Sequence, residues 1–305
     1  MSVTEPNAQH AAVDAAPHIS ERRRVWTALR RNKPALVGLF ILAVLVVVGV
    51  FGPLLAPYGV NEIDADNLFE GPSWKHPFGT DDAGRDVFSR VILAARVSLL
   101  VGVVSVGIAF FVGVTIGLIS GYYRGVVDNI FMRCMDVLFA FPVLLLAVAI
   151  VAVLGRGLGA AMVAIGVVYT PIFARVTRAS VLSVREQVFV QAAVATGAGD
   201  WRIMRRHVLP NIAAPLIVQT SLSLAFAILS EAALSFLGLG VQPPDPSWGR
   251  MLYEARGFVQ DAWWMGLFPG LAIFLVVLAF NIVGDALRDV LDPRQLTKEE
   301  LRRRV

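Results

Sequence analysis

The sequence predicts an all-α membrane protein with six transmembrane helices. The chain of 305 residues is 56% hydrophobic and only 16% charged, whereas soluble domains carry about 25% charged residues. The hydrophobic residues come in long uncharged runs, and a soluble core would alternate them with polar residues. Six runs reach the ~18 residues that a spanning helix needs, namely 34–61, 97–123, 137–155, 157–174, 208–230 and 262–284.

Two apolar stretches need a separate decision on whether they cross the membrane. The fourth contains Pro171, which a membrane helix tolerates because neighbouring groups satisfy the freed carbonyl. A further run at 232–244 is shorter and ends in Gln-Pro-Pro, so we expect it to lie at the interface or to re-enter the membrane. It is not counted as a span.

Glycines at every fourth position mark one face of the second run, where a neighbouring helix can approach closely. They are Gly113, Gly117 and Gly121. We expect this face to pack within the chain, and a subunit interface is the alternative.

The distribution of positive residues predicts the orientation. Twenty of the 27 Lys and Arg residues would lie on one side of the membrane and seven on the other, and the richer side is normally cytoplasmic. Both termini are therefore predicted to be cytoplasmic, with Asn67 outside and Asp200 inside. The chain divides into a partly disordered tail at 1–33, a six-helix domain at 34–284 and a second tail at 285–305.

Several kinds of chemistry lack their motifs. None of the lysines Lys33, Lys75 and Lys298 follows a glycine, so a phosphate-binding loop is absent. The four histidines form no HExxH pair, and no Gly-x-Ser-x-Gly sequence occurs. The single cysteine, Cys134, can form no disulfide within the chain. We therefore predict a non-catalytic protein that needs no cofactor or metal.

The predicted spans also argue against an ion-coupled carrier, which normally places ionisable residues within the membrane. None of the six runs contains a charged residue or a histidine. This favours transport driven by another subunit. An autonomous channel is the alternative.

The most informative segment is the fourth loop, at 183–211. Its sequence predicts two short helices separated by a glycine hinge at Gly197 and Gly199. Gly197 is expected to end the first helix in a left-handed backbone conformation, and Asp200 to be the N-cap of the second. Pro210 would then open the fifth span. Such a hinged loop suits insertion into a cleft of another protein, and an amphipathic pair lying on the lipid surface is the alternative.

The spacing of residues in this loop resembles a known motif. Gly197 lies four positions after Ala193 of the pair Ala192-Ala193, and Leu209-Pro210 follows Gly197 after eleven intervening residues. This resembles the EAA loop of permease subunits in ATP-binding-cassette (ABC) importers. One departure is Gln191, where the family usually has Glu; the amide keeps the hydrogen-bonding reach but has no charge for an ion pair with the ATPase. The resemblance implies ATPase coupling through Gln191, Ala192, Ala193, Gly197, Asp200, Leu209 and Pro210.

Stretches at 76–90, 230–249 and 284–293 further resemble the C-type subunit of the dipeptide, oligopeptide and nickel branch of this family. The resemblance implies a type I ABC importer permease fold in the bacterial inner membrane. It also implies four kinds of partner: a second, B-type permease, fused or separate ATPase subunits, an extracytoplasmic solute-binding protein and the lipid bilayer. The implied function is to form half of the pathway for di- or oligopeptides. Nickel or another solute is the alternative.

Two further groups of candidate residues follow. Uncharged polar side chains suit a pathway for peptides, whose two ends carry opposite charges, although bonding between helices is the commoner role of such residues. These candidates are Thr115, Tyr169, Thr170, Gln219, Ser223 and Asn281. The acidic first loop and the end of the fifth span are candidates for binding-protein contact or an outer gate, with a solvated loop as the alternative: Asp81, Asp82, Arg85, Asp86, Glu231, Gln242 and Trp248.

Overall fold

The computed structural model describes residues 32–291, so most of both predicted tails, 1–31 and 292–305, lies outside the described residues. All regular elements between residues 32 and 291 are helical. The long helices are α3 (Lys33–Leu55), α4 (Val87–Tyr123), α7 (Leu158–Arg185), α10 (Ala213–Phe236) and α12 (Trp264–Leu291). The shorter helices are α5 (Gly125–Phe139), α6 (Val143–Leu154), α8 (Val188–Ala195), α9 (Asp200–Ile203) and α11 (Trp248–Ala255).

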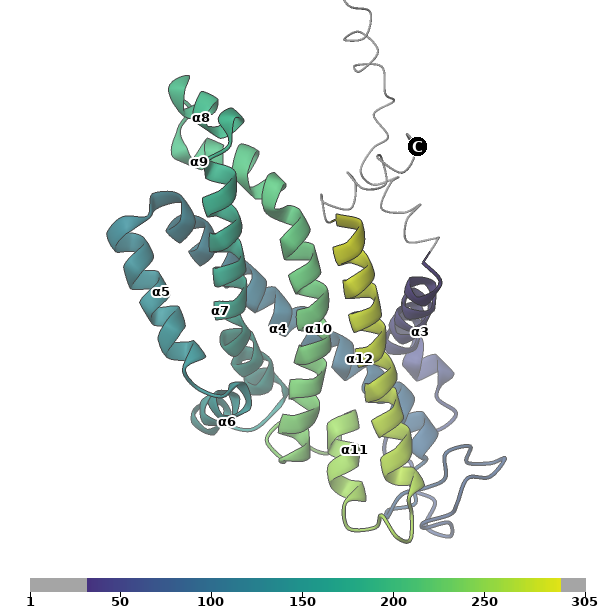
Figure 1. The fold of residues 1–305 in the computed structure, drawn as a ribbon. Helices are drawn as coiled ribbons and strands as arrows, with labels where there is room; N and C mark the ends of the chain where they lie inside the picture. The colour runs from purple at the N-terminus through teal and green to yellow at the C-terminus, as the bar shows by residue number, and fades with distance from the viewer. Residues whose placement is uncertain (1–31, 292–305) are drawn as a thin grey trace, which may run out of the picture.

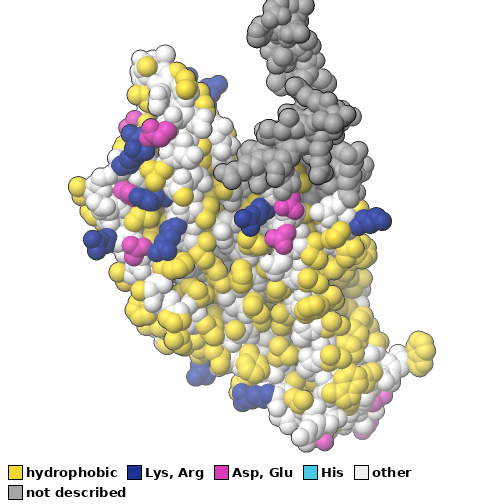
Figure 2. All heavy atoms as spheres, in the orientation of Figure 1, with side chains coloured by type: hydrophobic (Ala, Val, Ile, Leu, Met, Phe, Trp, Pro, Cys, Tyr) yellow, Lys and Arg dark blue, Asp and Glu magenta, His cyan; other side chains and the backbone are white. Residues whose placement is uncertain are grey.

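Among the described residues, five helical segments are long and apolar enough to cross a membrane, and a bent pair of helices provides a sixth candidate. The five are α3, α4, α7, α12 and the continuous segment Asp200–Phe236, which contains α10. Their surfaces carry large exposed apolar side chains such as Phe40, Val103 and Phe111. In Figure 2 hydrophobic side chains form a broad band across the body of the molecule, as contact with lipid requires.

The third predicted span differs from our expectation. Residues 137–155 do not form one straight helix, because α5 ends at Phe139 and α6 begins at Val143, and the two helices are bent by 93°. Pro142 explains the break, since it lacks an N–H and disfavours helical backbone at the residue before it. With 12 residues, α6 is about 18 Å long and too short to span alone. The pair α5–α6 can cross the membrane only as a single bent unit, and a re-entrant loop has the same geometry.

Helix α4 is the element around which the others are arranged. It runs diagonally behind α7, α10 and α12 in Figure 1 and contacts each of them. It begins ten residues before the predicted run, and its N-cap is Asp86, whose side chain accepts from the Ser89 N–H.

The glycine face of α4 packs within the chain, as predicted. A Cβ atom built on Gly113, Gly117 or Gly121 would lie less than 3 Å from atoms of α7. The nearest are the Thr170 carbonyl, the Ala174 carbonyl and the Val181 Cβ. These glycines therefore allow α4 and α7 to lie in backbone contact.

The run at 232–244 is no seventh span. Helix α10 continues to Phe236, and the chain then turns into the short helix α11, which packs between α10 and α12. Gly249 of α11 lies so close to Ala232 of α10 that an added Cβ would be 2.3 Å from the Ala232 carbonyl oxygen. The C-terminal end of α10 is thus covered by α11 and by the turn that precedes α11.

Candidate functional site

A knob, defined here as residues 186–203, projects beyond the ends of α7 and α10 in Figure 1. Its first helix, α8, ends at a Schellman motif. The Ala198 N–H donates to the Ala193 carbonyl at 3.1 Å, and the Gly197 N–H donates to the Val194 carbonyl at 2.9 Å. Gly197 has φ +77°, so the predicted left-handed glycine at the hinge is confirmed.

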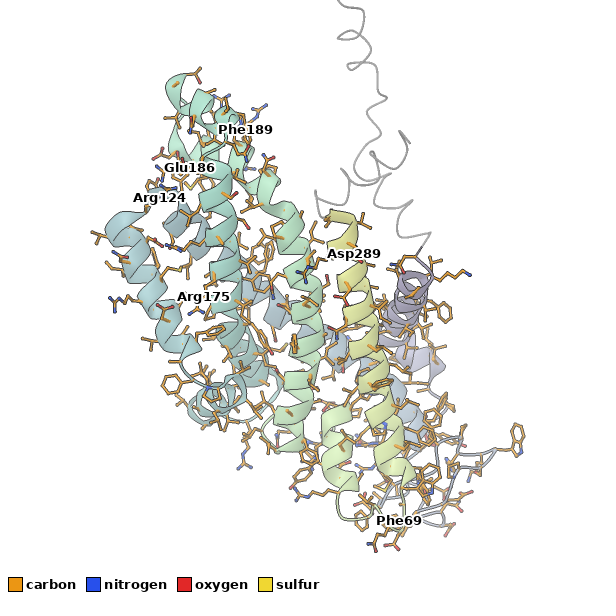
Figure 3. The ribbon with its side chains drawn as sticks, viewed as in Figure 1. Phe69, Arg124, Arg175, Glu186, Phe189 and Asp289 are labelled. Carbon is orange, nitrogen blue, oxygen red and sulfur yellow. The ribbon has the colours of Figure 1, made fainter. Side chains whose placement is uncertain are left out.

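The knob has one anchored side and one uncovered side. Val190 and Ile203 are buried against the helix ends, whereas Val188 is 81% and Trp201 is 67% exposed. Phe189 is labelled on the knob in Figure 3. Ala192 and Gln191 are also exposed, and the Gln191 amide donates to the Glu186 carbonyl at 3.3 Å. Large apolar side chains on a projecting surface are typical of a contact site for another molecule.

Asp200 does not cap α9, which corrects our expectation. Gly199 occupies the N-cap, and Asp200 is the first residue of the helix. The Asp200 carboxylate instead accepts a hydrogen bond from the Tyr122 hydroxyl at 2.9 Å, across 78 residues of sequence. Sequence reasoning missed this partner because a long-range contact leaves no local pattern.

Pro210 does not begin a separate helix. The chain is helical from Asp200 to Phe236, but a π-turn at Met204–Val208 and a 3-10 turn at Leu209–Ile212 precede α10. Pro210 has no N–H and cannot donate the regular helical hydrogen bond. The hydrogen-bond pattern therefore changes from α-helical to π and 3-10 around it. Leu209 is half-buried against the core.

Ion pairs join α5 to α7, and one more lies at the base of the knob. The Asp128 carboxylate accepts from Arg178 at 2.6 Å in a bidentate pair, and Arg175 donates to Asp136 at 2.7 Å. Arg124 donates to Glu186 at 2.6 Å, where the two are labelled close together in Figure 3. The predicted runs 97–123 and 137–155 leave residues 124–136 as a connecting loop, but most of this segment is helical in α5. The partners on α7 explain why charged residues lie in a helix here.

The six pathway candidates differ in their surroundings. Thr115, Thr170 and Asn281 each donate to the carbonyl four residues earlier on their own helix. The Tyr169 hydroxyl on α7 lies 3.1 Å from the Ser230 hydroxyl on α10.

The last two pathway candidates bond to each other, because the Gln219 amide donates to the Ser223 hydroxyl at 3.1 Å. Ser223 is buried, whereas Gln219 is half-buried. Gln219 is therefore the better placed of the two to face a solute.

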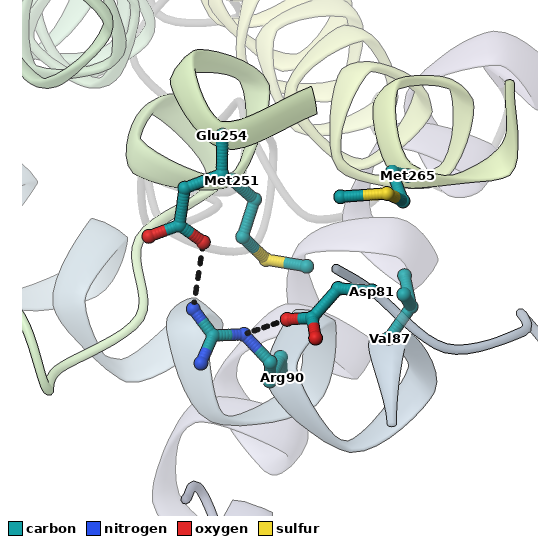
Figure 4. A pocket seen from close by; sticks show the side chains of 6 residues that line it. All are labelled: Asp81, Val87, Arg90, Met251, Glu254 and Met265. Carbon is teal, nitrogen blue, oxygen red and sulfur yellow. Dashed lines mark hydrogen bonds and ion pairs between the residues drawn. The ribbon is translucent and has the colours of Figure 1, made fainter. Parts of the chain in front are cut away.

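At the end opposite the knob, an ionic cluster joins the 56–86 loop to α4 and α11. Figure 4 shows Arg90 between Asp81 and Glu254, at 3.8 and 3.2 Å. Arg85 donates to Asp81 at 2.7 Å and to Glu254 at 3.3 Å, and Arg250 donates to Glu254 at 2.9 Å. Arg90 is 2% exposed, so the cluster holds three chain segments together.

Asp81 and Asp86 are structural in this conformation. Asp81 accepts from the backbone N–H groups of Ala83 and Arg85, both at 2.9 Å. Asp86 caps α4 and also bonds to His76 Nδ1 at 2.9 Å. Of the loop candidates only Asp82 is exposed, with its side chain 40% accessible.

Glu231, Gln242 and Trp248 support the turn after α10. The Ser235 hydroxyl donates to Glu231 at 2.6 Å and accepts from the Val241 N–H at 3.0 Å. Gln242 donates to two carbonyls of the same turn, and the buried Trp248 indole donates to the Val91 carbonyl of α4 at 3.0 Å.

The 56–86 loop borders a surface cavity of about 440 Å³, whose lining includes Tyr58, His76, Lys75 and the four acidic residues Glu62, Asp64, Asp66 and Asp86. Lys75 and then Asn67 donate to Asp64 and lower the pKa of its carboxyl from 3.8 to about 2. The carboxyl therefore stays ionised throughout the physiological range. Within residues 32–291 no cluster of three or more His, Cys, Asp or Glu side chains could hold a metal ion.

Comparison with known proteins decides the family. A sequence profile described as "Binding-protein-dependent transport system inner membrane component" matches residues 113–297, and one for the "N-terminal TM domain of oligopeptide transport permease C" matches residues 20–72. The chain belongs to this family of ABC importer permeases. It is thus a non-catalytic membrane component whose family works with a separate ATPase, as the resemblance of the 183–211 loop predicted.

Curated relatives match along nearly the whole chain. The dipeptide transport system permease protein DppC of Alkalihalophilus pseudofirmus is 48% identical over 290 residues, 95% of each chain. The di/tripeptide permease DppC of Pseudomonas aeruginosa is 46% identical, covering 94% of this chain and 98% of the relative. The glutathione transport system permease protein GsiD of Pectobacterium atrosepticum is 45% identical, covering 89% and 91%.

Solved structures share the fold. An inward-facing MetNI methionine ABC transporter aligns with a TM-score of 0.56 at 20% identity, over 67% of this chain and 97% of the other. A second crystal form gives a TM-score of 0.53. The predicted importer permease fold is confirmed.

Proposed function

We propose that the chain forms half of the transmembrane pathway of an ATP-driven importer for di- or oligopeptides in the bacterial inner membrane. The support is the family and the relatives, whose names specify dipeptides, di/tripeptides and glutathione. Nickel or another small solute is the alternative substrate. A second permease, ATPase subunits and a solute-binding protein complete the proposed complex.

The observation that carries the coupling proposal is the knob. It combines a glycine-terminated helix with uncovered apolar side chains, and its buried side packs against the ends of the spanning helices. A body of this kind can enter a cleft of the ATPase and move the helices when the cleft closes. Gln191 would contribute a neutral hydrogen-bonding group to that contact.

The test is the variant Gly197→Asp. An L-residue pays roughly 1 kcal/mol or more to adopt the left-handed backbone, and the new side chain would project into open space where the ATPase is proposed to sit. Gly155→Asp is the matched control, because Gly155 also has a positive φ, +96°, and open space around it, but lies in the turn between α6 and α7.

We expect Gly197→Asp to insert normally and to pair with the second permease, but to lose uptake and substrate-stimulated ATP hydrolysis in vesicles containing the whole complex. Gly155→Asp should keep both. Ala193→Glu, which places a charge on the half-buried side of α8, should resemble Gly197→Asp. Normal coupling in both knob variants would return the knob to the alternative of a lipid-facing amphipathic pair.

The same vesicles separate the transport classes. Uptake that requires added ATPase and binding protein supports the proposal, whereas uptake by the purified chain alone would identify an autonomous channel or carrier. Competition by dipeptides, tripeptides and Ni²⁺ then separates the substrates.

The pathway proposal is tested at Gln219, with Ile217 of the same helix as control. Ile217 is 47% exposed and apolar, as a lipid-facing residue would be. Gln219→Trp should reduce peptide uptake at least tenfold by filling the path, and Ile217→Trp should not. Equal uptake in the two variants would show that this face of α10 does not line the path.

The orientation is tested by thiol labelling after the exposed native Cys134 has been replaced. A cysteine introduced at the fully exposed Trp74 of the 56–86 loop should react with an impermeant reagent from outside, and so should one at Asn67. Tags at Ser2 and Val305 should be cytoplasmic. Labelling of Asp200→Cys from outside would invert the topology.

A further inference from the structure

The hydroxyl and backbone of Tyr122 join three segments near the base of the knob. Tyr122 is the penultimate residue of α4 and is 8% exposed. Its hydroxyl donates to Asp200, the first residue of α9, at 2.9 Å. Its carbonyl accepts from Arg185, the last residue of α7, whose guanidinium lies 5.5 Å from the centre of the Tyr122 ring. The ends of three helices therefore meet at one residue.

The connectivity makes this meeting point informative. The knob lies between α7 and the Asp200–Phe236 segment in the sequence, so a displaced knob pulls directly on these two. Helix α4 has no such covalent connection, since its end leads into α5. The contact from Tyr122 to Asp200 supplies a partly buried non-covalent connection between α4 and the knob, in addition to the exposed ion pair of Arg124 with Glu186.

The packing of α4 along its length would let the whole helix move when its end is displaced by the knob. Its glycine face places α4 and α7 in backbone contact along Gly113, Gly117 and Gly121, with no room for a side chain between them. The hydrogen bond from Tyr122 to Asp200 connects the start of the Asp200–Phe236 segment, next to the knob, to the packed pair α4 and α7. The three helices can then tilt as one body.

We infer that Tyr122 is a positioning residue for energy coupling, which transmits displacement of the knob to α4 through its hydrogen bond to Asp200. This inference rests on the proposed coupling function of the knob. Tyr122 touches neither the substrate nor the ATPase. Its effect is to make the end of α4 move with the knob.

The experiment compares Tyr122→Phe with Tyr253→Phe in vesicles containing the whole importer. Tyr122→Phe keeps the ring and removes only the hydroxyl. Tyr253 lies in α11, at the other end of the molecule; Arg250 and Arg256 lie over its ring, which Tyr253→Phe keeps, and its hydroxyl makes no hydrogen bond to any residue in 32–291. Uptake per ATP hydrolysed is measured together with co-purification of the ATPase subunits.

We expect Tyr122→Phe to retain the ATPase subunits while uptake per ATP falls roughly tenfold, the factor that corresponds to the lower end of the range for a hydrogen bond to a charged group. Asp200→Ala should give the same loss, and Tyr122→Phe combined with Asp200→Ala should lose no more than either alone. Asp200→Asn keeps an acceptor oxygen and should restore most of the coupling.

Unchanged uptake per ATP in Tyr122→Phe would overturn the inference, and so would losses that add in the double variant. A loss of the ATPase subunits from Tyr122→Phe would also overturn it, since the residue would then act on assembly. The variant Gly197→Asp keeps the two proposals distinguishable. If Gly197→Asp is uncoupled and Tyr122→Phe is normal, only the role of Tyr122 fails; if both are normal, the coupling function of the knob fails as well.

Discussion

Gly117 offers the sharpest test of how α4 and α7 are held together. In Gly117→Ala the new Cβ would lie 2.4 Å from the Ala174 carbonyl oxygen, 2.6 Å from the Thr177 Cβ and 3.0 Å from the Arg178 nitrogen. Ordinary contacts of a Cβ begin near 3.4 Å, so the helices must separate by about 1 Å. No change of rotamer can relieve the clash, because two of the three atoms belong to the backbone of α7.

This geometry sets the expected loss of folding stability in Gly117→Ala. Overpacking of a close-packed interior costs ~1–3 kcal/mol, and the upper part of this range applies because the backbone must move. The matched control is Gly107→Ala, since Gly107 lies in the same helix and a Cβ there would meet no atom within 4 Å. That substitution should be neutral, or stabilising by up to ~1 kcal/mol through helix propensity.

The assay is unfolding of the purified chain in detergent, followed by tryptophan fluorescence. Gly117→Ala should unfold at a clearly lower temperature or denaturant concentration than the parent, and Gly107→Ala should not. If the two alanine variants unfold alike, the close contact between α4 and α7 does not exist in the protein, and the coupling argument built on it fails too.

Two further predictions concern the end opposite the knob. Arg90→Ala should destabilise the chain by about 3 kcal/mol, the lower end of the cost of leaving buried carboxylates without their partner, because Arg85 still compensates part of the charge; the exposed Arg96→Ala should stay within about 0.5 kcal/mol in the same unfolding assay. The Asp64 carboxyl, whose pKa is lowered to about 2 chiefly by Lys75, should titrate near pH 2 in carbon-13 NMR, and Lys75→Met should raise that pKa toward 3.8. Since the folded pKa is depressed, any stability from this pair is present above about pH 4 and disappears as the pH falls through 2. A normal titration of Asp64 in the parent chain would exclude the contact with Lys75.

Apolar runs located most of the fold, because the bilayer requires long uncharged helices. Five of the six predicted runs coincide with long apolar helices. The exception is 137–155, where the break at Pro142 was visible as a proline within an apolar run, but its angle depends on packing. The helical segment at 124–136 was missed because its charged residues read as a loop until their partners on α7 are known.

In the candidate site, too, features set by local sequence could be predicted, whereas those that depend on distant contacts could not. The left-handed Gly197 follows from local backbone preference, so the sequence predicted it. Asp200 was misassigned because an N-cap is a local explanation, whereas its actual partner, Tyr122, comes from a distant helix. Trp248 and Asp81 could equally have been exposed, and only the packing of α11 and the 56–86 loop places them inside.

The length and continuity of α4 have a consequence for communication across the membrane. Its 37 residues contain no proline and extend about 55 Å, well beyond the ~30 Å hydrocarbon layer. One end carries the Asp86 cap and the buried Arg90, and the other carries Tyr122 below the knob. A single unbroken rod therefore reaches both aqueous compartments. In the proposed importer, docking of the solute-binding protein on one side of the membrane and ATP hydrolysis on the other would therefore act on opposite ends of the same helix.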